Sequence, residues 1–437
     1  MATMSQDEYT IIKVRERGRG GSVTFIPEPA AEPLFCPVIS VDDHLLEPGD
    51  LFERRLPGKY SDSAPFLGPG EDGAPWWQIG DTRIPILMSN GAAGRVMTEW
   101  GLQASRPDEE FRRGVWDSKA RLRDLDIGGV WATLCFPSIL FGFAGWRFSR
   151  MPDPELGLAC VRAYNDWMLE EWCGAAPQRY IPCQIPWLSD PELGAKEIRR
   201  NAARGVRAVS FSENPEALGF ANIYDRAWDP FFAACEETGT VVNLHVGSSG
   251  TIHLPSSVSH EAVGTALFPV SGLEALVDWT YSGLPVRFPG LKVALSEAGI
   301  SWVPMAKERL RRAHRQADGI GKGWPRDAPT PVEVVERNFF FTSIEDPSGF
   351  RLIDLIGRDK VMVETDYPHF DSTWPQCQAM IRSELAGASP ELIRMVCYEN
   401  AARLYNHPLP PAEMIQRSEI GAPETSAPSQ AGPSESD

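Results

Sequence analysis

The first residues in the chain that could carry chemistry are Asp42 and His44, which come directly after an apolar run at 35–40. The run is typical of a short buried strand. Residues i and i+2 of an extended chain project to the same face. Asp42 and His44 could therefore hold one metal ion from one side, at the C-terminal end of a strand. Glu47 follows where the chain turns away.

Further carboxylates and histidines follow three later apolar segments of strand length. One such residue at a strand end is more often a structural hydrogen-bonding partner or a helix cap. Several at the ends of different strands are much harder to explain by coincidence, so we treat them as candidate metal ligands. They are His245 near the end of 240–246, Glu297 at the end of 291–297, and Asp366 and His369 after 360–365.

Apolar segments of strand length alternate with segments of helical periodicity along most of the chain. Strands are predicted at 35–40, 129–137, 179–187, 206–211, 240–246, 291–297, 338–344 and 360–365. Helices are predicted at 154–175, 191–204, 225–238, 302–316 and 390–405. This alternation with mostly apolar strands predicts an α/β fold with a parallel sheet covered on both faces. Eight such units favour a closed (β/α)8 TIM barrel, whose active site lies at the C-terminal ends of the strands.

The remaining segments divide the chain into a barrel and two peripheral ends. We expect a flexible N-terminal segment at 1–33, the barrel at 34–407 and a disordered tail at 408–437, which is rich in Pro, Ser and Gly. A long insertion after the first strand, at 49–115, has no clear period and is expected to form a lid or small subdomain. Apolar walls for a substrate pocket are expected from five aromatic residues, Trp76, Trp77, Phe141, Trp146 and Trp374.

The composition argues against some classes of partner. The 437-residue chain has a net charge of −17 at pH 7, which makes nucleic acid and anionic membranes poor partners. Its 8 cysteines include no CxxC pair, which favours a reducing cytosol over a disulfide scaffold. Residues 1–19 lack the hydrophobic core of an export signal. We therefore expect a cytoplasmic protein, not bound to a membrane, that acts on a small molecule.

The candidate ligands give the chain a resemblance to a known family. The sequence is similar to the amidohydrolase superfamily, in the amidohydrolase-related branch that contains decarboxylases of aromatic and muconate semialdehyde acids. That family carries a His, Glu or Asp, one spacer and a His on strand one, a His ending strand five, and an Asp ending strand eight. Asp42, His44, His245 and Asp366 match these positions. The resemblance spans about residues 35–406 and implies a divalent metal in a distorted TIM barrel.

The chain departs from those decarboxylases at strand six, where they carry a catalytic His and this chain has Glu297. One divalent ion takes about four to six protein and water ligands. The chain offers seven donors, which favours two ions, and a carboxylate-rich set suits an Fe/Fe or Mn/Fe pair. The seven expected metal ligands are Asp42, His44, Glu47, His245, Glu297, Asp366 and His369.

The chain is also similar to one subgroup of the superfamily, the amidohydrolase-related dinuclear oxygenases. The shared features are an Asp-X-His-X-X-Glu motif on strand one, a Glu at the end of strand six and an Asp-Tyr-Pro-His segment after strand eight. This resemblance implies a non-haem iron monooxygenase that hydroxylates an aliphatic C–H bond, with Glu297, Asp366 and His369 as catalytic residues. Such an enzyme needs O2 and an external electron donor, because the chain shows no flavin, nicotinamide or iron–sulfur motif. The resemblance also implies a homo-oligomer or a complex with a related subunit.

Two other functions stay open at this point. One is a metal-dependent hydrolase or non-oxidative decarboxylase of a carboxylic acid, with Zn2+ or Mn2+, in which Glu297 acts as a base rather than a ligand. The other is a non-catalytic metal-binding or subunit-interaction protein, which the complete ligand set disfavours. Neither the insertion nor the Phe/Trp-rich segment at 141–148 contains a motif that identifies the substrate.

Overall fold

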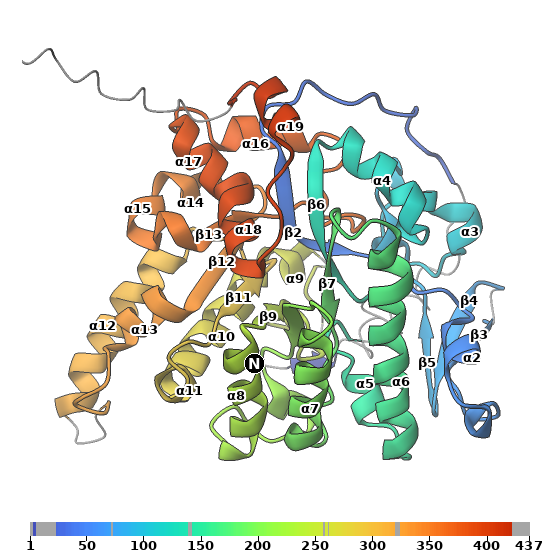
Figure 1. The fold of residues 1–437 in the computed structure, drawn as a ribbon, viewed down its shortest axis with the longest axis horizontal. Coiled ribbons are helices and arrows are strands. Elements are labelled where there is room, and N and C mark those ends of the chain that lie inside the picture. The colour runs from blue at the N-terminus through green and yellow to red at the C-terminus, as the bar shows by residue number, and fades with distance from the viewer. Residues whose placement is uncertain are drawn as a thin grey trace, which may run out of the picture.

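A computed structural model describes residues 3–5, 23–70, 73–138, 142–256, 258–260, 262–319 and 324–421. Phe141 and residues 422–437 of the predicted tail lie outside these ranges. Helices surround a central sheet of eight strands, and a small separate sheet lies to one side of it (Figure 1).

The central sheet is built from parallel strands, and each overlaps one of the eight predicted segments. The hydrogen-bonded order is β13-β12-β11-β9-β8-β7-β6-β2. Hydrogen bonds also join β2 to the chain just after β13, because Asp366 N donates to Asp42 O (2.9 Å) and His44 N donates to Tyr367 O (2.6 Å). The sheet is therefore a nearly closed (β/α)8 barrel, which confirms the predicted fold. Its strands are β2 (Val38–His44), β6 (Val130–Phe136), β7 (Tyr180–Gln184), β8 (Ala208–Phe211), β9 (Val241–His245), β11 (Val293–Ser296), β12 (Phe339–Ser343) and β13 (Val361–Val363).

The first barrel strand extends further than predicted. The apolar run 35–40 predicts a strand that ends before Asp42, whereas β2 continues to His44 and is buried along its whole length. It continues because β6 pairs beside it as far as Phe136, which lies opposite His44. Asp42 and His44 are therefore held by the sheet itself and not by a loop after it.

Each predicted helical segment coincides with an outer helix, but four of the main helices, at 118–127, 268–281, 331–338 and 377–384, lie outside the predicted segments. Asp153 and Asp190 each accept hydrogen bonds from two backbone N–H groups of the helix that follows, and a proline occupies the first turn of both helices. Helices α6 and α17 each continue into a π-helical turn, at Met168–Trp172 and Met395–Glu399. The main helices are α4 (Ser118–Ile127), α6 (Pro154–Trp167), α7 (Pro191–Ala202), α8 (Asp229–Thr238), α10 (Phe268–Tyr281), α12 (Val303–Gly319), α13 (Pro331–Asn338), α16 (Cys377–Glu384), α17 (Pro390–Arg394) and α18 (Asn400–Tyr405).

The insertion at 49–115 contains regular structure that its sequence does not reveal. It begins with α2 (Leu51–Arg55) and forms an antiparallel sheet of β3 (Phe66–Pro69), β4 (Pro75–Ile79) and β5 (Thr82–Pro85). These strands have four or five residues and contain prolines, so no alternating pattern develops. Trp77 of β4 is fully buried and packs edge-on against Phe52, with ring centroids 5.8 Å apart.

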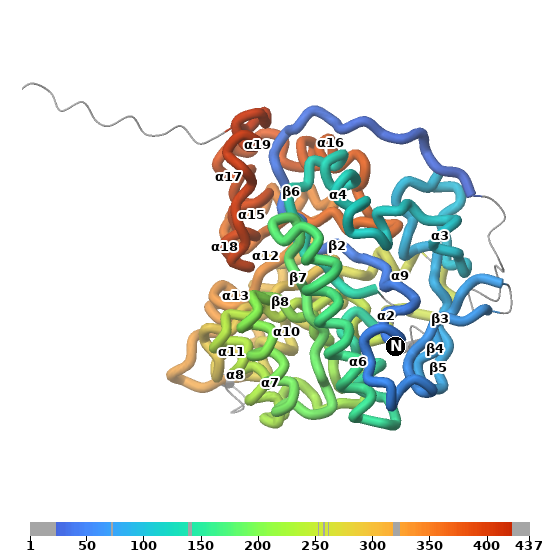
Figure 2. Tube along the Cα trace, turned by 45° about the vertical axis from the view of Figure 1, so that its right-hand side comes forward, coloured from blue at the N-terminus to red at the C-terminus, as the bar shows by residue number. Residues whose placement is uncertain are grey.

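Both ends of the chain contact the barrel domain where the structure describes them. β1 (Thr3–Ser5) pairs with β10 (Thr251–His253), and residues from 23 onward pass α16 and α4 on the outside (Figure 2). Within the segment predicted as a disordered tail, Ala412–Arg417 forms α19. Glu419 N then donates a hydrogen bond to Leu34 O at 3.0 Å.

All 8 cysteines are buried and free, so they pack as small apolar residues. In the described part of the chain, no helix is long and apolar enough to cross a membrane.

Candidate metal centre

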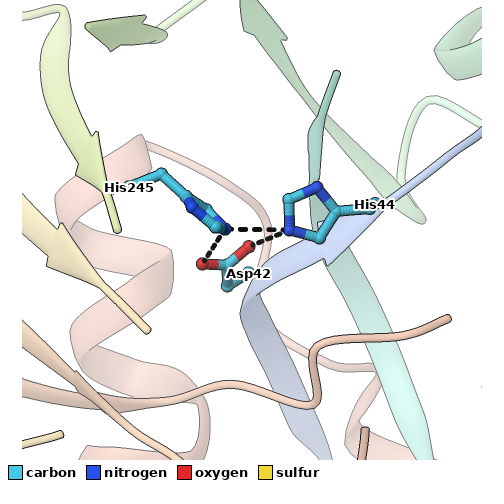
Figure 3. Close-up of side chains that lie close together, drawn as sticks. All are labelled: Asp42, His44 and His245. Atoms are coloured by element: carbon cyan, nitrogen blue, oxygen red, sulfur yellow. Dashed lines mark hydrogen bonds and ion pairs between the residues drawn. The ribbon is translucent and has the colours of Figure 1, made fainter. Parts of the chain in front are cut away.

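Side chains from β2, β9 and the segment after β13 meet at the C-terminal end of the barrel. Asp42, His44 and His245 point toward one another (Figure 3). Asp42 Oδ1 lies 3.1 Å from His44 Nε2, and Asp42 Oδ2 lies 3.4 Å from His245 Nε2. Asp366 Oδ1 lies 3.4 Å from His44 Nε2 and 3.1 Å from His369 Nδ1. Five of the seven expected ligands therefore meet, in two groups that share His44.

The imidazoles of His44 and His245 face each other through nitrogens that both lack a proton. His44 Nδ1 lies 3.1 Å from Pro137 O, and His245 Nδ1 lies 2.6 Å from Val246 O. A carbonyl oxygen only accepts, so Nδ1 carries the proton in each neutral ring and Nε2 presents a lone pair. The two Nε2 atoms are 3.0 Å apart. Lone pairs at this distance repel unless a cation lies between them, and this arrangement of histidine donors suits a metal ion.

Burial determines the charge state of these side chains. It lowers the pKa of His245 to about 4 and that of His369 to about 3, and it lowers the pKa of His44 well below its usual value. Burial, followed by the neighbouring carboxylates, raises the pKa values of Asp42 and Asp366 well above their usual range.

The donor atoms of this cluster also lack hydrogen bonds. Among the described residues, neither carboxylate oxygen of Asp42 or Asp366 has a hydrogen bond of normal geometry, and His369 Nε2 has none. Unpaired buried polar atoms are costly, and a divalent cation would satisfy them. The five residues therefore fit a divalent metal.

Asp43 is a structural residue of the site that the sequence analysis did not identify. Its carboxylate accepts hydrogen bonds from the hydroxyls of Ser40 (3.1 Å), Thr133 (2.5 Å) and Thr365 (2.6 Å), and from Tyr367 N (2.9 Å). It thus links β2 to β6 and to the chain after β13, on either side of two candidate ligands. The sequence does contain an indication of this role. Asp43 lies between Asp42 and His44, and because alternate residues of a strand face opposite sides, its side chain points away from those two.

Glu47 and Glu297 do not join the two groups of ligand atoms that the described residues form. Glu47 accepts hydrogen bonds from Ser138 N (3.0 Å) and Ser138 Oγ (2.7 Å), so both of its oxygens are engaged. Glu297 Oε2 lies 3.7 Å from His245 Nδ1, the nitrogen that faces away from His44. The two carboxylates that suggested a second ion therefore lie outside the cluster.

The backbone at two of the candidate residues adopts a conformation that side chains rarely occupy. Glu297 has φ +62° and Asp366 has φ +46°, which costs about 1–3 kcal/mol for each residue. Hydrogen bonds hold both positions, since Glu297 N donates to Glu364 Oε2 (3.3 Å) and Asp366 N donates to Asp42 O. Glu364 was missed in the sequence, although it lies two residues before Asp366. Strain of this kind is typical of functional sites.

A cavity of about 740 Å3 opens beside the cluster. Glu297 and His369 line its inner end together with Phe143, whose ring stacks on His245 with centroids 4.1 Å apart. The insertion contributes one wall, with Leu87 and Trp100 among its residues. Other lining residues come from the chain after β9, from α9 (Ala262–Ala266) and from the start of α10.

The aromatic residues of this cavity differ from those expected. Trp77 belongs to the core of the insertion, and Trp374 packs edge-on against Tyr367 with centroids 5.7 Å apart. The described residues that line the cavity include none of the four expected tryptophans, Trp76, Trp77, Trp146 and Trp374. The aromatic lining is instead Trp100, Phe143, Phe268 and Phe370. The expectation was wrong because tryptophan is large enough to fill the core, and sequence does not distinguish core from lining.

Comparisons with known proteins agree with this geometry. The family model for amidohydrolases matches residues 112–407, more than half of the chain. The 2-amino-3-carboxymuconate-6-semialdehyde decarboxylase of Dictyostelium discoideum is 23% identical over 263 residues, which are 59% of this chain and 68% of that protein. The gamma-resorcylate decarboxylase of Rhodococcus jostii is 24% identical over 274 residues, 59% of this chain and 82% of that protein.

Solved structures of similar fold include an amidohydrolase from Mycobacterium avium subsp. paratuberculosis. It has a TM-score of 0.68 and 23% identity, and the match covers 85% of this chain and 99% of that one. The 5-carboxyvanillate decarboxylase of Novosphingobium aromaticivorans, complexed with manganese and 4-hydroxy-3-methoxy-5-nitrobenzoic acid, has a TM-score of 0.60 and 15% identity. That match covers 88% of this chain and 100% of the other.

These relatives contradict the expected monooxygenase. Both relatives found by sequence are decarboxylases, so neither the iron oxygenase activity nor the expected O2 and electron donor is supported. The physical reason for the error is the ligand count, which included Glu47 and Glu297 although neither joins the cluster. The family model, the eight-stranded barrel and the cluster at its C-terminal end together show that the chain belongs to the amidohydrolase family, in its amidohydrolase-related branch.

Proposed function

We propose that the protein is a metal-dependent, non-oxidative decarboxylase of a carboxylic acid. The observation that carries the proposal is the position of Glu297, which lines the cavity next to the donor cluster without being one of its grouped ligands. A carboxyl group placed there can exchange a proton with a bound substrate. The decarboxylases among the relatives support the same reaction.

The metal of the proposed enzyme is one divalent ion, Mn2+ or Zn2+. Asp42, His44, His245 and Asp366 would hold it, with His369 beside them as a fifth donor. The manganese bound by the similar 5-carboxyvanillate decarboxylase supports this choice of metal. When bound, the ion supplies positive charge that orients the substrate carboxylate and stabilises negative charge as it develops.

The chain itself supplies the proton that replaces CO2. When the bond between the substrate carbon and its carboxylate breaks, the electron pair stays on that carbon, and the carbon must then be protonated. Burial, followed by the nearby Asp371 carboxylate, raises the pKa of Glu297 well above its usual value, which favours the protonated form that can act as a donor. Glu297 donates this proton to the carbon and is reprotonated from solvent.

The apolar cavity walls favour this reaction, because they exclude water from the substrate. Phe143 covers the face of His245 at the inner end of the cavity. The relatives that act on aromatic acids suggest an unsaturated or aromatic acid as substrate, whose ring or double bonds can delocalise the electron pair.

The proposal is tested with protein loaded with Mn2+ and, separately, with Zn2+. CO2 release is measured with and without O2 from 2-hydroxybenzoate, 2,6-dihydroxybenzoate, 5-carboxyvanillate and 4-hexyl-2-hydroxybenzoate, so that the acids include one with a large apolar substituent. We expect CO2 release at the same rate under both conditions. No CO2 release from any of these acids, or turnover that depends on O2, would overturn the proposal.

A variant separates the proton-donor role of Glu297 from a ligand role. In E297Q, kcat for CO2 release is expected to fall about 10²- to 10⁴-fold because the proton donor is lost. The metal content, measured by elemental analysis, should stay at the wild-type value. The exposed Glu53→Gln serves as the matched control and should change neither quantity. A loss of metal in E297Q would instead show that Glu297 is a ligand.

A further inference from the structure

The cavity beside the metal centre has a size and lining that limit what the substrate can be. Its volume of about 740 Å3 lies in the upper part of the range of about 300–1,000 Å3 that encloses drug-sized ligands. A single aromatic ring with a carboxylate would leave much of this space empty. The apolar side chains around it would then stay in contact with water, and the binding energy available from covering them would be lost.

Apolar side chains dominate the lining of the cavity. Leu87, Trp100 and Leu102 come from the insertion and Leu267, Phe268 and Phe370 from the rest of the chain, with polar residues such as Ser89, Asn90 and Thr251 among them. The insertion wall lies before residue 112, where the match to the family model begins.

The described lining of the cavity contains few ionisable side chains. Among the described lining residues there is no lysine or arginine. Glu297 and His369 lie at the metal end, and His253 and His260 lie elsewhere along the wall. His253 is engaged by Glu274, with 3.1 Å between Nε2 and Oε2, and His260 Nδ1 accepts a hydrogen bond from Ala262 N (3.2 Å). A second anionic group on the substrate would find no free cation along these walls, and burying it there would be costly.

We infer that the substrate is a large monocarboxylate whose single acidic group lies at the metal and whose remainder is an extended apolar body, such as an alkyl-substituted or polycyclic ring system. This inference rests on the proposed decarboxylase function and narrows its substrate class. Small dihydroxybenzoates and dicarboxylates are poor substrates by the same argument, because they either fill little of the cavity or bring a second charge into it.

Gly264 provides a way to alter the cavity without touching the metal centre. It lines the cavity in α9, and a Cβ added there would meet only Leu254 Cδ2, at 3.9 Å. A leucine at this position would extend into the open space, and it favours a helix more than glycine does. Gly58 is an exposed glycine at which an added Cβ meets nothing within 4 Å, so Gly58→Leu is the matched control.

The test uses 2-hydroxybenzoates that carry a straight alkyl chain of one to six carbons at position 4, opposite the carboxylate. For the metal-loaded full-length protein, kcat/KM for CO2 release and the affinity by calorimetry are both expected to rise about fourfold per methylene. The dianion 2-hydroxyterephthalate should bind roughly tenfold or more weakly than the 4-methyl compound. In G264L the gain for the longest chains should disappear while the 4-methyl compound is unaffected, and G58L should behave as wild type.

The two measurements keep this inference separate from the proposed reaction. Affinity that rises with chain length without any CO2 release supports the large apolar substrate and overturns the decarboxylase. CO2 release that is flat or falls along the series, or that is fastest with 2-hydroxyterephthalate, overturns the inference and leaves the decarboxylase standing. An unchanged chain-length dependence in G264L places the alkyl chain outside this cavity and also overturns the inference. Absence of both binding and turnover across the series overturns both.

Discussion

At the scale of single residues, the site depends on which atoms the ligands present. His44 and His245 turn their Nε2 lone pairs toward each other because backbone carbonyls of Pro137 and Val246 bind the opposite nitrogens. Residue type alone gave the donors but not their direction. For the same reason the residue type of Glu47 predicts a ligand, whereas Ser138 donates hydrogen bonds to both of its oxygens.

Glu47 gives a prediction for the pH dependence of stability. Burial raises the pKa of Glu47 from 4.5 to about 7. Between these pH values the folded protein binds more protons than the unfolded chain, so the free energy of unfolding falls as pH rises through this window and levels off above it. Glu47→Gln should remove this part of the pH dependence, about 3 kcal/mol in total.

The measurement is urea unfolding of wild type and E47Q at pH 5, 6, 7 and 8. The metal content of E47Q should equal that of wild type, since Glu47 lies outside the ligand groups. An identical pH dependence in the two proteins, or a loss of metal in the variant, would contradict the prediction. Glu53→Gln again provides the exposed control.

At the scale of elements, strand pairing brings ligands that are distant in the sequence into one cluster. β2 and the chain after β13 supply four of the five clustered side chains, and Asp43 links the two segments. Its hydrogen bonds to Thr365 and Tyr367 join residues more than 300 positions apart. The sequence predicted every barrel strand, because apolar runs and turn residues are local signals. It did not predict the short strands of the insertion or the link through Asp43.

Replacing Asp43 tests this link between the elements. In Asp43→Asn one oxygen acceptor becomes a donor, so at least one of the bonds from Thr133, Thr365 and Tyr367 is lost. We expect the free energy of unfolding to fall by about 1–3 kcal/mol and the metal affinity to fall about 10- to 100-fold. Chemical unfolding and metal titration check the two effects, and the exposed Asp359→Asn is the control. Wild-type metal affinity in D43N would show that the link does not position the ligands.

At the scale of the whole molecule, the barrel, the insertion and the chain after β9 enclose a cavity that none of them forms alone. The cavity opens on the donor cluster, which concentrates unpaired lone pairs and carboxylates at one buried point. Bound metal should therefore stabilise the entire fold. Association into a homo-oligomer, or with a related subunit, remains a prediction that size-exclusion chromatography with light scattering tests.

Metal removal gives the prediction at this scale. Adding Mn2+ or Zn2+ to chelator-treated protein should raise the free energy of unfolding by about 2.7 kcal/mol at a free-metal concentration 100-fold above Kd. Thermal unfolding with increasing metal concentration measures the effect. In His245→Ala the stabilisation should be smaller, because one donor of the cluster is lost. Equal melting temperatures with and without metal would contradict the predicted site.

The sequence by itself determined the eight-stranded α/β barrel and most residues of the donor cluster that fits a metal, because strand periodicity and donors at strand ends are encoded in short stretches of chain. Only the tertiary structure decided which donors converge. Glu47 accepts hydrogen bonds from Ser138, which is 91 residues away in the sequence. Glu297 lies beside Nδ1 of His245, the nitrogen that faces away from His44. The aromatic lining of the cavity was likewise decided by the packing of the insertion against the barrel. These outcomes depend on side-chain directions and on contacts between distant segments, which local sequence patterns do not contain.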